Sequence, residues 1–133
     1  MIAKTLPTTL QGFFSNAWTH AVIEKHPRCV DGGSCMYRCY DPSGDHSKDN
    51  ACLIGCSIPE DIYKPGMENR TVAIALDMVG YRQEEEESFG DALLDLQQVH
   101  DQTTDGTYLF TVESNLRVFA AQYSLTIPGE MAP

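Results

Sequence analysis

The sequence predicts an α+β fold, in which a small antiparallel β-hairpin of two or three strands is packed by about four α-helices. The first observation is that three long segments carry apolar residues at helical spacing. The second is that two short runs bracket a polar loop, which is the pattern of a hairpin. The third is size, because 133 residues suffice for one hydrophobic core. We therefore expect a single domain over residues 1–127 and a flexible tail over residues 128–133.

The clearest helix is predicted over residues 8–26. Its apolar residues recur three or four positions apart and form one stripe, made of Leu10, Phe13, Phe14, Trp18, Ala21 and Val22. Pro27 forces the helix to end just before it. His20 and His26 lie at or beyond the edge of the stripe, so we expect both to be solvated.

Two further helices are predicted over residues 88–100 and 107–124, where apolar residues again follow helical spacing. Residues 71–81 fit either a buried strand or a short helix, and we favour the helix. Residues 80–87 form an acidic loop whose glutamates suit the approach to a helix N-terminus.

The hairpin is predicted from two runs, residues 34–41 and 50–58, on either side of the polar loop over residues 42–49. A helical turn should follow through Tyr63, and Pro65 should end it.

Four of the five cysteines lie in these runs. Partners in an antiparallel hairpin have residue numbers with a constant total, and one register would set Cys35 opposite Cys56 and Cys39 opposite Cys52. Such pairs would touch, and either could crosslink in an oxidising environment. In a reducing cytosol we expect the four side chains to pack as small apolar groups on the core face.

A cysteine-based metal site or enzyme is the alternative for these residues. Zinc favours four sulfur or nitrogen ligands, but residues four apart on a straight strand are separated by about 13 Å, too far to share one ion. The remaining zinc candidates are Cys35, Cys52, Cys56 and His100. A cysteine nucleophile would need a base, for which His46 and His100 are the candidates. We expect no cofactor, with zinc as the alternative.

Charge and hydropathy limit the classes of partner and the cellular location that we expect for this protein. The formal net charge of −10 argues against direct nucleic-acid binding, which requires clustered basic residues. An acidic surface could instead imitate DNA, with Glu84–Glu87, Asp91 and Asp95 as the charged face. No run approaches the roughly 20 apolar residues that a membrane span needs, and no signal core follows the N-terminus, so we expect a cytoplasmic protein without membrane contact.

The hairpin and the turn after it resemble a widespread group of small uncharacterised proteins of tailed phages and prophages. The resemblance rests on three motifs, which are Cys35-x-Tyr37-Arg38, Cys52-x-x-Gly55-Cys56-x-Ile58-Pro59-x-x-x-Tyr63-x-Pro65-x-Met67-Glu68 and Asp95-Leu96-Gln97-x-x-His100-Asp101. Cys39 and a longer loop replace the glycine-rich turn of the typical member, and Asn69 replaces a glycine. The resemblance implies a phage or prophage origin and a location in the host cytoplasm, but no known activity.

These observations favour a non-enzymatic accessory protein that binds a host protein or a small ligand, for instance to counter host defence. The alternatives are the cysteine-based metal protein or enzyme and the acidic DNA mimic. We expect the binding residues along the turn and beside the Tyr-Arg pair, namely Tyr37, Arg38, Pro59, Tyr63, Lys64, Pro65, Met67 and Glu68.

Overall fold

The computed structural model describes most of the chain, namely residues 2–27, 29–31, 34–40, 42–45, 49–68, 70–78, 87–101 and 108–130. The predicted acidic loop over residues 80–87 lies outside these ranges except for its last residue, and so does His46. No helix in the described ranges is long and apolar enough to cross a membrane.

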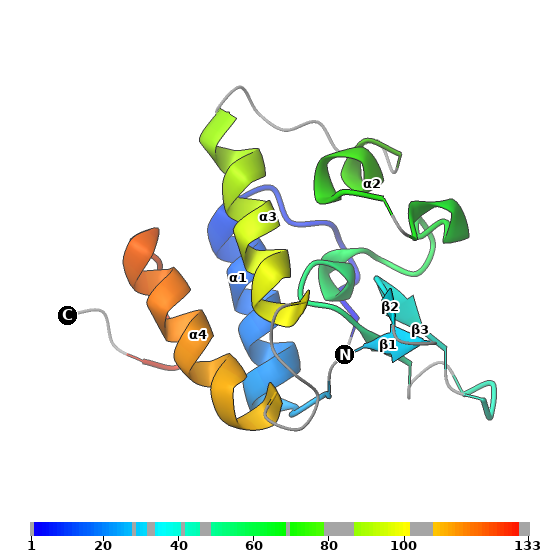
Figure 1. Ribbon diagram of the computed structural model, residues 1–133, viewed down its shortest axis with the longest axis horizontal. Helices are drawn as coiled ribbons and strands as arrows, with labels where there is room; N and C mark the ends of the chain where they lie inside the picture. The colour runs from blue at the N-terminus through cyan, green and yellow to red at the C-terminus, as the bar shows by residue number, and fades with distance from the viewer. Residues whose placement is uncertain are drawn as a thin grey trace.

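Three helices lie side by side on one side of the molecule (Figure 1). They are α1 (Leu10–Trp18), which continues as the π-helical turn η1 (Thr19–Ile23), α3 (Glu87–Asp101) and α4 (Tyr108–Gln122). The periodicity predicted all three, within a few residues at each end. Together with the short strands they confirm an α+β fold.

The hydrophobic core forms where these helices meet. The helices contribute buried apolar side chains, among them Phe13, Phe14, Ala17, Trp18, Leu93, Leu96, Val112, Leu116 and Phe119. The rings of Phe14 and Phe119 stack with their centroids 5.9 Å apart, which ties α1 to α4. Burial of each of the Phe, Leu and Val side chains contributes about 1.5–3 kcal/mol.

The short elements lie on the other side, next to α2 (Figure 1). The helix α2 (Val72–Met78) confirms the helical prediction for this segment, and the 3₁₀ turn η4 (Pro65–Met67) precedes it. Because Ala75 and Leu76 are buried and Ile74 is exposed, α2 presents one apolar face to the core.

The strands are shorter than predicted and form two separate antiparallel ladders. The first joins β1 (Val30–Asp31) to β2 (Ser34–Cys35), and the second joins β3 (Arg38–Cys39) to β4 (Asn50–Ala51). The second ladder is the predicted hairpin, but its register differs by two residues, since Cys39 lies opposite Asn50.

The register differs because the chain leaves the strand conformation straight after β4. The 3₁₀ turn η3 (Gly55–Ser57) begins where the prediction continues the strand. Gly55 packs on the backbone of Tyr37, where an added Cβ would lie 1.9 Å from the Tyr37 carbonyl oxygen. Pairing of this hairpin therefore cannot continue to Cys56.

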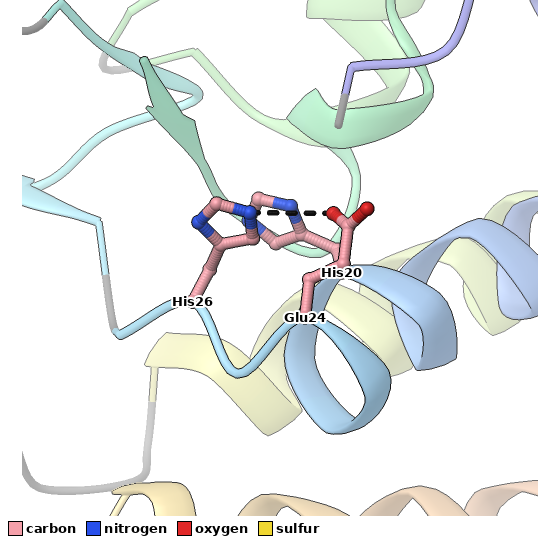
Figure 2. A group of neighbouring side chains, drawn as sticks. All are labelled: His20, Glu24 and His26. Carbon is pink, nitrogen blue, oxygen red and sulfur yellow. Dashed lines mark ion pairs between the residues drawn. The ribbon is translucent and has the colours of Figure 1, made fainter. Parts of the chain in front are cut away.

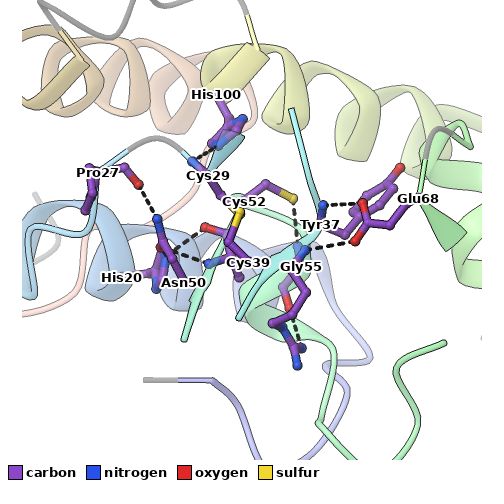
Figure 3. Close-up of a disulfide and its surroundings, with 12 residues drawn as sticks. His20, Pro27, Cys29, Tyr37, Cys39, Asn50, Cys52, Gly55, Glu68 and His100 are labelled. Atoms are coloured by element: carbon purple, nitrogen blue, oxygen red, sulfur yellow. Dashed lines mark hydrogen bonds between the residues drawn. A yellow bond between two sulfur atoms is a disulfide. The ribbon is translucent and has the colours of Figure 1, made fainter. Parts of the chain in front are cut away.

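The predicted cysteine pairs do not form across this hairpin. Cys39 instead forms a disulfide with Cys29, whose Cα lies 6.1 Å away (Figure 3). The backbone of Cys35 pairs with Val30, while Cys52 and Cys56 are buried thiols outside the disulfide. The prediction that Cys52 and Cys56 pack in the interior is confirmed, whereas the expectation that Cys39 packs as an uncrosslinked thiol is wrong.

Candidate functional site

Arg38 is the central residue of the predicted binding region. Its side chain is buried, with 2% of the residue exposed. One terminal nitrogen forms an ion pair with the Glu60 carboxylate, and the other donates to the backbone oxygen of Ile58 at 2.7 Å. The Nε atom has no hydrogen-bond partner among the described residues. A buried guanidinium needs such partners to offset its lost hydration, so the Nε–H is an unused donor.

The Glu68 carboxylate fixes the strand that carries Arg38. Its two oxygens accept hydrogen bonds from the backbone N–H groups of Tyr37 at 2.8 Å and Arg38 at 3.1 Å. Figure 3 shows the first of these contacts at Tyr37. The Tyr63 hydroxyl donates to the same carboxylate at 2.5 Å. One side chain thus joins β3 to the turn before η4.

Tyr63 lies against the guanidinium. The Arg38 Cζ atom is 4.7 Å from the centre of the Tyr63 ring, a cation–π distance. The Tyr40 ring meets Tyr63 edge-on with centroids 6.2 Å apart. Burial, aided by the hydrogen bond to Glu68, raises the pKa of Tyr63, so this hydroxyl stays protonated at neutral pH.

A cavity of about 480 Å³ opens beside this network. It is lined by Met36, Arg38, Cys39, Tyr40, Tyr63, Pro65 and Glu68. This volume is within the range of small-ligand sites, which combine apolar and aromatic walls with a few fixed polar groups.

The structure brings four of the eight predicted residues to the cavity wall, which are Arg38, Tyr63, Pro65 and Glu68. The other four lie elsewhere. Tyr37 is buried and its hydroxyl donates to the backbone oxygen of Arg70 at 2.7 Å. Pro59 and Met67 are buried as well. Lys64 is exposed, and its ammonium donates to the backbone oxygen of Met78 at 3.2 Å.

Sequence reasoning missed Met36 and Tyr40 in the wall and Glu60 as the partner of Arg38. The first two could have been found, because Met36, Arg38 and Tyr40 alternate along the chain and a strand directs alternate side chains to one face. Glu60 carried no such signal, since its pairing with Arg38 depends on how η3 folds back.

The described residues of the cysteine-based alternative make contacts that support the fold. Cys52 Sγ accepts from the Gly55 N–H at 3.1 Å, and the Cys56 thiol contacts the Leu53 backbone oxygen at 3.4 Å. Burial raises the pKa of the Cys56 thiol, which makes it a poor nucleophile. His100 Nε2 accepts from the Cys29 N–H at 2.9 Å. The side chain of Cys35 and all of His46 lie outside the described residues.

A different group of potential metal ligands appears at the end of η1. The described side chains contain one set of three or more such residues with close ligand atoms, formed by His20, Glu24 and His26 (Figure 2). The expectation that His20 is solvated is wrong, because only 2% of this residue is exposed. Burial, together with the neighbouring His26, lowers the pKa of His20 to about 4.

Only part of the acidic face proposed for DNA mimicry is described. Glu84, Glu85 and Glu86 lie outside the described residues, and Glu87 begins α3. Asp91 is exposed, whereas the Asp95 carboxylate accepts a hydrogen bond from the Tyr123 hydroxyl. Asp95 is thus tied to α4.

Comparisons with models of known protein families, with curated proteins and with solved structures found no significant match.

Proposed function

We propose that this chain is a non-enzymatic binding protein that holds a small ligand, or a side chain of a host protein, in the Arg38 cavity. The observation that carries the proposal is the buried Arg38 guanidinium, which lines the cavity and whose Nε–H finds no acceptor among the described residues. A buried donor left unpaired costs free energy, and a ligand oxygen would recover it. Functional sites often contain such unfavourable local features, which lower the stability of the fold and are compensated elsewhere in the structure.

The walls indicate the chemistry of the ligand. Tyr40 and Tyr63 offer aromatic surface, and Met36 and Pro65 add apolar surface. Glu68 lines the same cavity and Glu60 pairs with Arg38, so two carboxylates accompany one guanidinium. This balance disfavours a multiply charged anion. The best fit is a flat, largely apolar group that carries a neutral acceptor such as an amide or ring carbonyl.

The biological setting of the proposal is a phage or prophage accessory protein in the host cytoplasm, acting on a host partner or on a host defence. The motifs quoted above support it. In a reducing cytoplasm Cys29 and Cys39 would be thiols. The contacts of Glu68 with β3 and with Tyr63 do not involve the disulfide, so the cavity wall would keep those anchors.

The proposal is tested by capture from host extract with a matched pair of variants. Tyr40→Ala removes a cavity wall residue that is 48% exposed, and Ile74→Ala removes a residue of similar exposure on α2. Immobilised proteins are incubated with extract, and the retained small molecules and proteins are identified by mass spectrometry. We expect one species to be retained by the unmodified chain and by Ile74→Ala, and lost from Tyr40→Ala. Retention that does not depend on Tyr40, or no retention at all, would contradict the proposal.

A further inference from the structure

The end of the first helix brings three side chains together through an irregular backbone. In the π-helical turn η1 the Glu24 N–H bonds to the Thr19 oxygen, five residues back, at 2.8 Å. Lys25 then adopts a left-handed conformation with φ 56°, which is uncommon for a residue other than glycine. This reversal lets the His26 N–H bond to the His20 oxygen at 3.1 Å. The backbone therefore folds His26 back over His20.

The side chains meet as a result. Figure 2 shows the two imidazole rings face to face beside the Glu24 carboxylate. The ring centroids are 4.1 Å apart, and the planes are inclined by 12°. His26 Nε2 lies 3.3 Å from a Glu24 oxygen, and one ligand atom from each of the three residues lies within 4.8 Å of the others.

His20 is oriented as a metal-binding histidine would be. Its Nε2 contacts two acceptors, the Ala51 backbone oxygen at 2.8 Å and the Asn50 side-chain oxygen at 3.0 Å. The Asn50 amide is oriented by its own donation to the Pro27 oxygen at 2.8 Å, as drawn in Figure 3. Two acceptors require the proton of His20 to be on Nε2, which leaves a lone pair on Nδ1.

The described part of the chain offers that lone pair no partner. His20 Nδ1 is buried and makes no hydrogen bond among the described residues. The stacking of the two rings leaves this nitrogen without a hydrogen bond. Histidine ligands of metals commonly donate their second ring N–H to a backbone carbonyl, as His20 does to Ala51.

We propose that His20, Glu24 and His26 form a binding site for a divalent transition metal, with Zn²⁺ as the ion that fits best. Two imidazoles and one carboxylate are a known zinc ligand set, whereas Mg²⁺ and Ca²⁺ prefer oxygen ligands. Zinc bonds of about 2.0–2.1 Å place tetrahedral ligand atoms about 3.3–3.5 Å apart. The His26 to Glu24 distance of 3.3 Å already meets this requirement.

Closure of the site needs one movement. Two parallel stacked rings cannot both hold one ion in their planes, so the ion would draw His26 out of the stack. His26 is only partly buried, with 25% of its side chain exposed, and can turn without disturbing the core. His20 is fixed by β4 and would stay in place. Three protein ligands leave a fourth position for water, as in zinc sites that are not closed.

The test is zinc binding by isothermal titration calorimetry with ZnCl₂ as the probe. The full chain, with its Cys29–Cys39 disulfide intact, is stripped with a chelator and returned to chelator-free buffer. His26→Ala and Glu24→Gln alter partly exposed ligands, so circular dichroism should show an unchanged fold for both. His20 is not replaced, because its buried contacts with β4 also support folding. The control is Glu113→Gln, which alters an exposed carboxylate on α4.

We expect one Zn²⁺ per chain and a loss of affinity of about tenfold or more in each of the two ligand variants, with Glu113→Gln unchanged. Substitution with Co²⁺ separates this site from the buried thiols of Cys52 and Cys56. Histidine and carboxylate ligands give visible d–d bands without thiolate-to-cobalt charge transfer. The proposal is overturned if no Zn²⁺ binds, if both variants bind as the unmodified chain does, or if the thiolate band appears. It is independent of the function proposed for the Arg38 cavity.

Discussion

At the scale of single residues, Arg38 and Glu68 have different roles in the wall of the cavity. Arg38 supplies a buried positive charge, which Glu60 and backbone oxygens compensate in part. Glu68 holds the backbone from which that guanidinium extends. The geometry of the cavity therefore depends on a residue whose carboxylate faces backbone donors and a tyrosine hydroxyl.

Removal of that carboxylate should be costly. Glu68→Ala leaves the N–H groups of Tyr37 and Arg38 and the Tyr63 hydroxyl without their acceptor, and we expect the free energy of unfolding to fall by about 2–4 kcal/mol. Urea denaturation measures this change. The control Glu113→Ala breaks an exposed ion pair with Arg117 and should change stability by less than about 1 kcal/mol. Equal losses in the two variants would mean that Glu68 is not an anchor.

Gly55 is the second residue whose role is specific. Because an added Cβ would meet the backbone oxygen of Tyr37 at 1.9 Å, Gly55→Ala must displace η3 from β3, at a cost of about 3 kcal/mol. At Gly66 the nearest atom is the flexible end of Met78, 3.3 Å away, so Gly66→Ala should cost under about 1 kcal/mol. Thermal unfolding of the two variants compares them directly, and a Gly55→Ala protein as stable as Gly66→Ala would refute this packing.

At the scale of elements, the strand pair β3–β4 and the disulfide hold the same short segment. The Cys29–Cys39 bond closes a loop of sequence separation 10, so Cys39→Ser should lower the free energy of unfolding by about 2–3 kcal/mol in oxidised protein. Cys29→Ser and the double variant should lose the same amount, since one bond is lost in each case. With a reductant present, the unmodified chain should approach the stability of the variants. A reductant that leaves its denaturation midpoint unchanged would contradict the disulfide.

The helices were predictable because their signal is local. The apolar stripe from Leu10 to Trp18 can be read from spacing alone, and tertiary packing then uses that stripe. Strand pairing is not local. The register of β3 with β4 depends on where Gly55 packs against Tyr37, and that contact cannot be inferred from the numbering of cysteines. The disulfide was missed because Cys29 precedes the predicted hairpin.

The two candidate sites differ in the same respect, because one could be predicted from the sequence and the other could not. Arg38, Tyr63, Pro65 and Glu68 were predicted from their place in the motifs, and the structure gathers them at one cavity. The cluster of His20, Glu24 and His26 was not predicted. A regular helix would have placed His26 away from His20, and the π-helical turn and the left-handed Lys25 had no signal in the sequence.

At the scale of the whole molecule, one helical layer supports the irregular half that carries the Arg38 cavity, while the cluster of His20, Glu24 and His26 lies at the end of the first helix of that layer (Figure 1). The stability of that layer should depend on the contact between α1 and α4. Phe119→Ala removes a buried ring that stacks on Phe14, and we expect a loss of about 3–5 kcal/mol. Val118→Ala, at a neighbouring position that is 66% exposed, should stay within about 0.5 kcal/mol of the unmodified chain. Urea denaturation measures both changes. Similar midpoints for the two variants would mean that the contact between Phe14 and Phe119 is not part of the core.

The central claim is that the Arg38 Nε–H is a donor kept for a ligand, and arginine-selective ¹⁵N NMR tests it most directly. The protein is titrated with the species that it retains from host extract, and the Nε–H resonances are followed. We predict that the Arg38 resonance shifts and becomes protected from exchange with water, while that of the exposed Arg117, which pairs with Glu113 and Glu130, stays in place. Binding that leaves the Arg38 resonance unmoved would contradict the account.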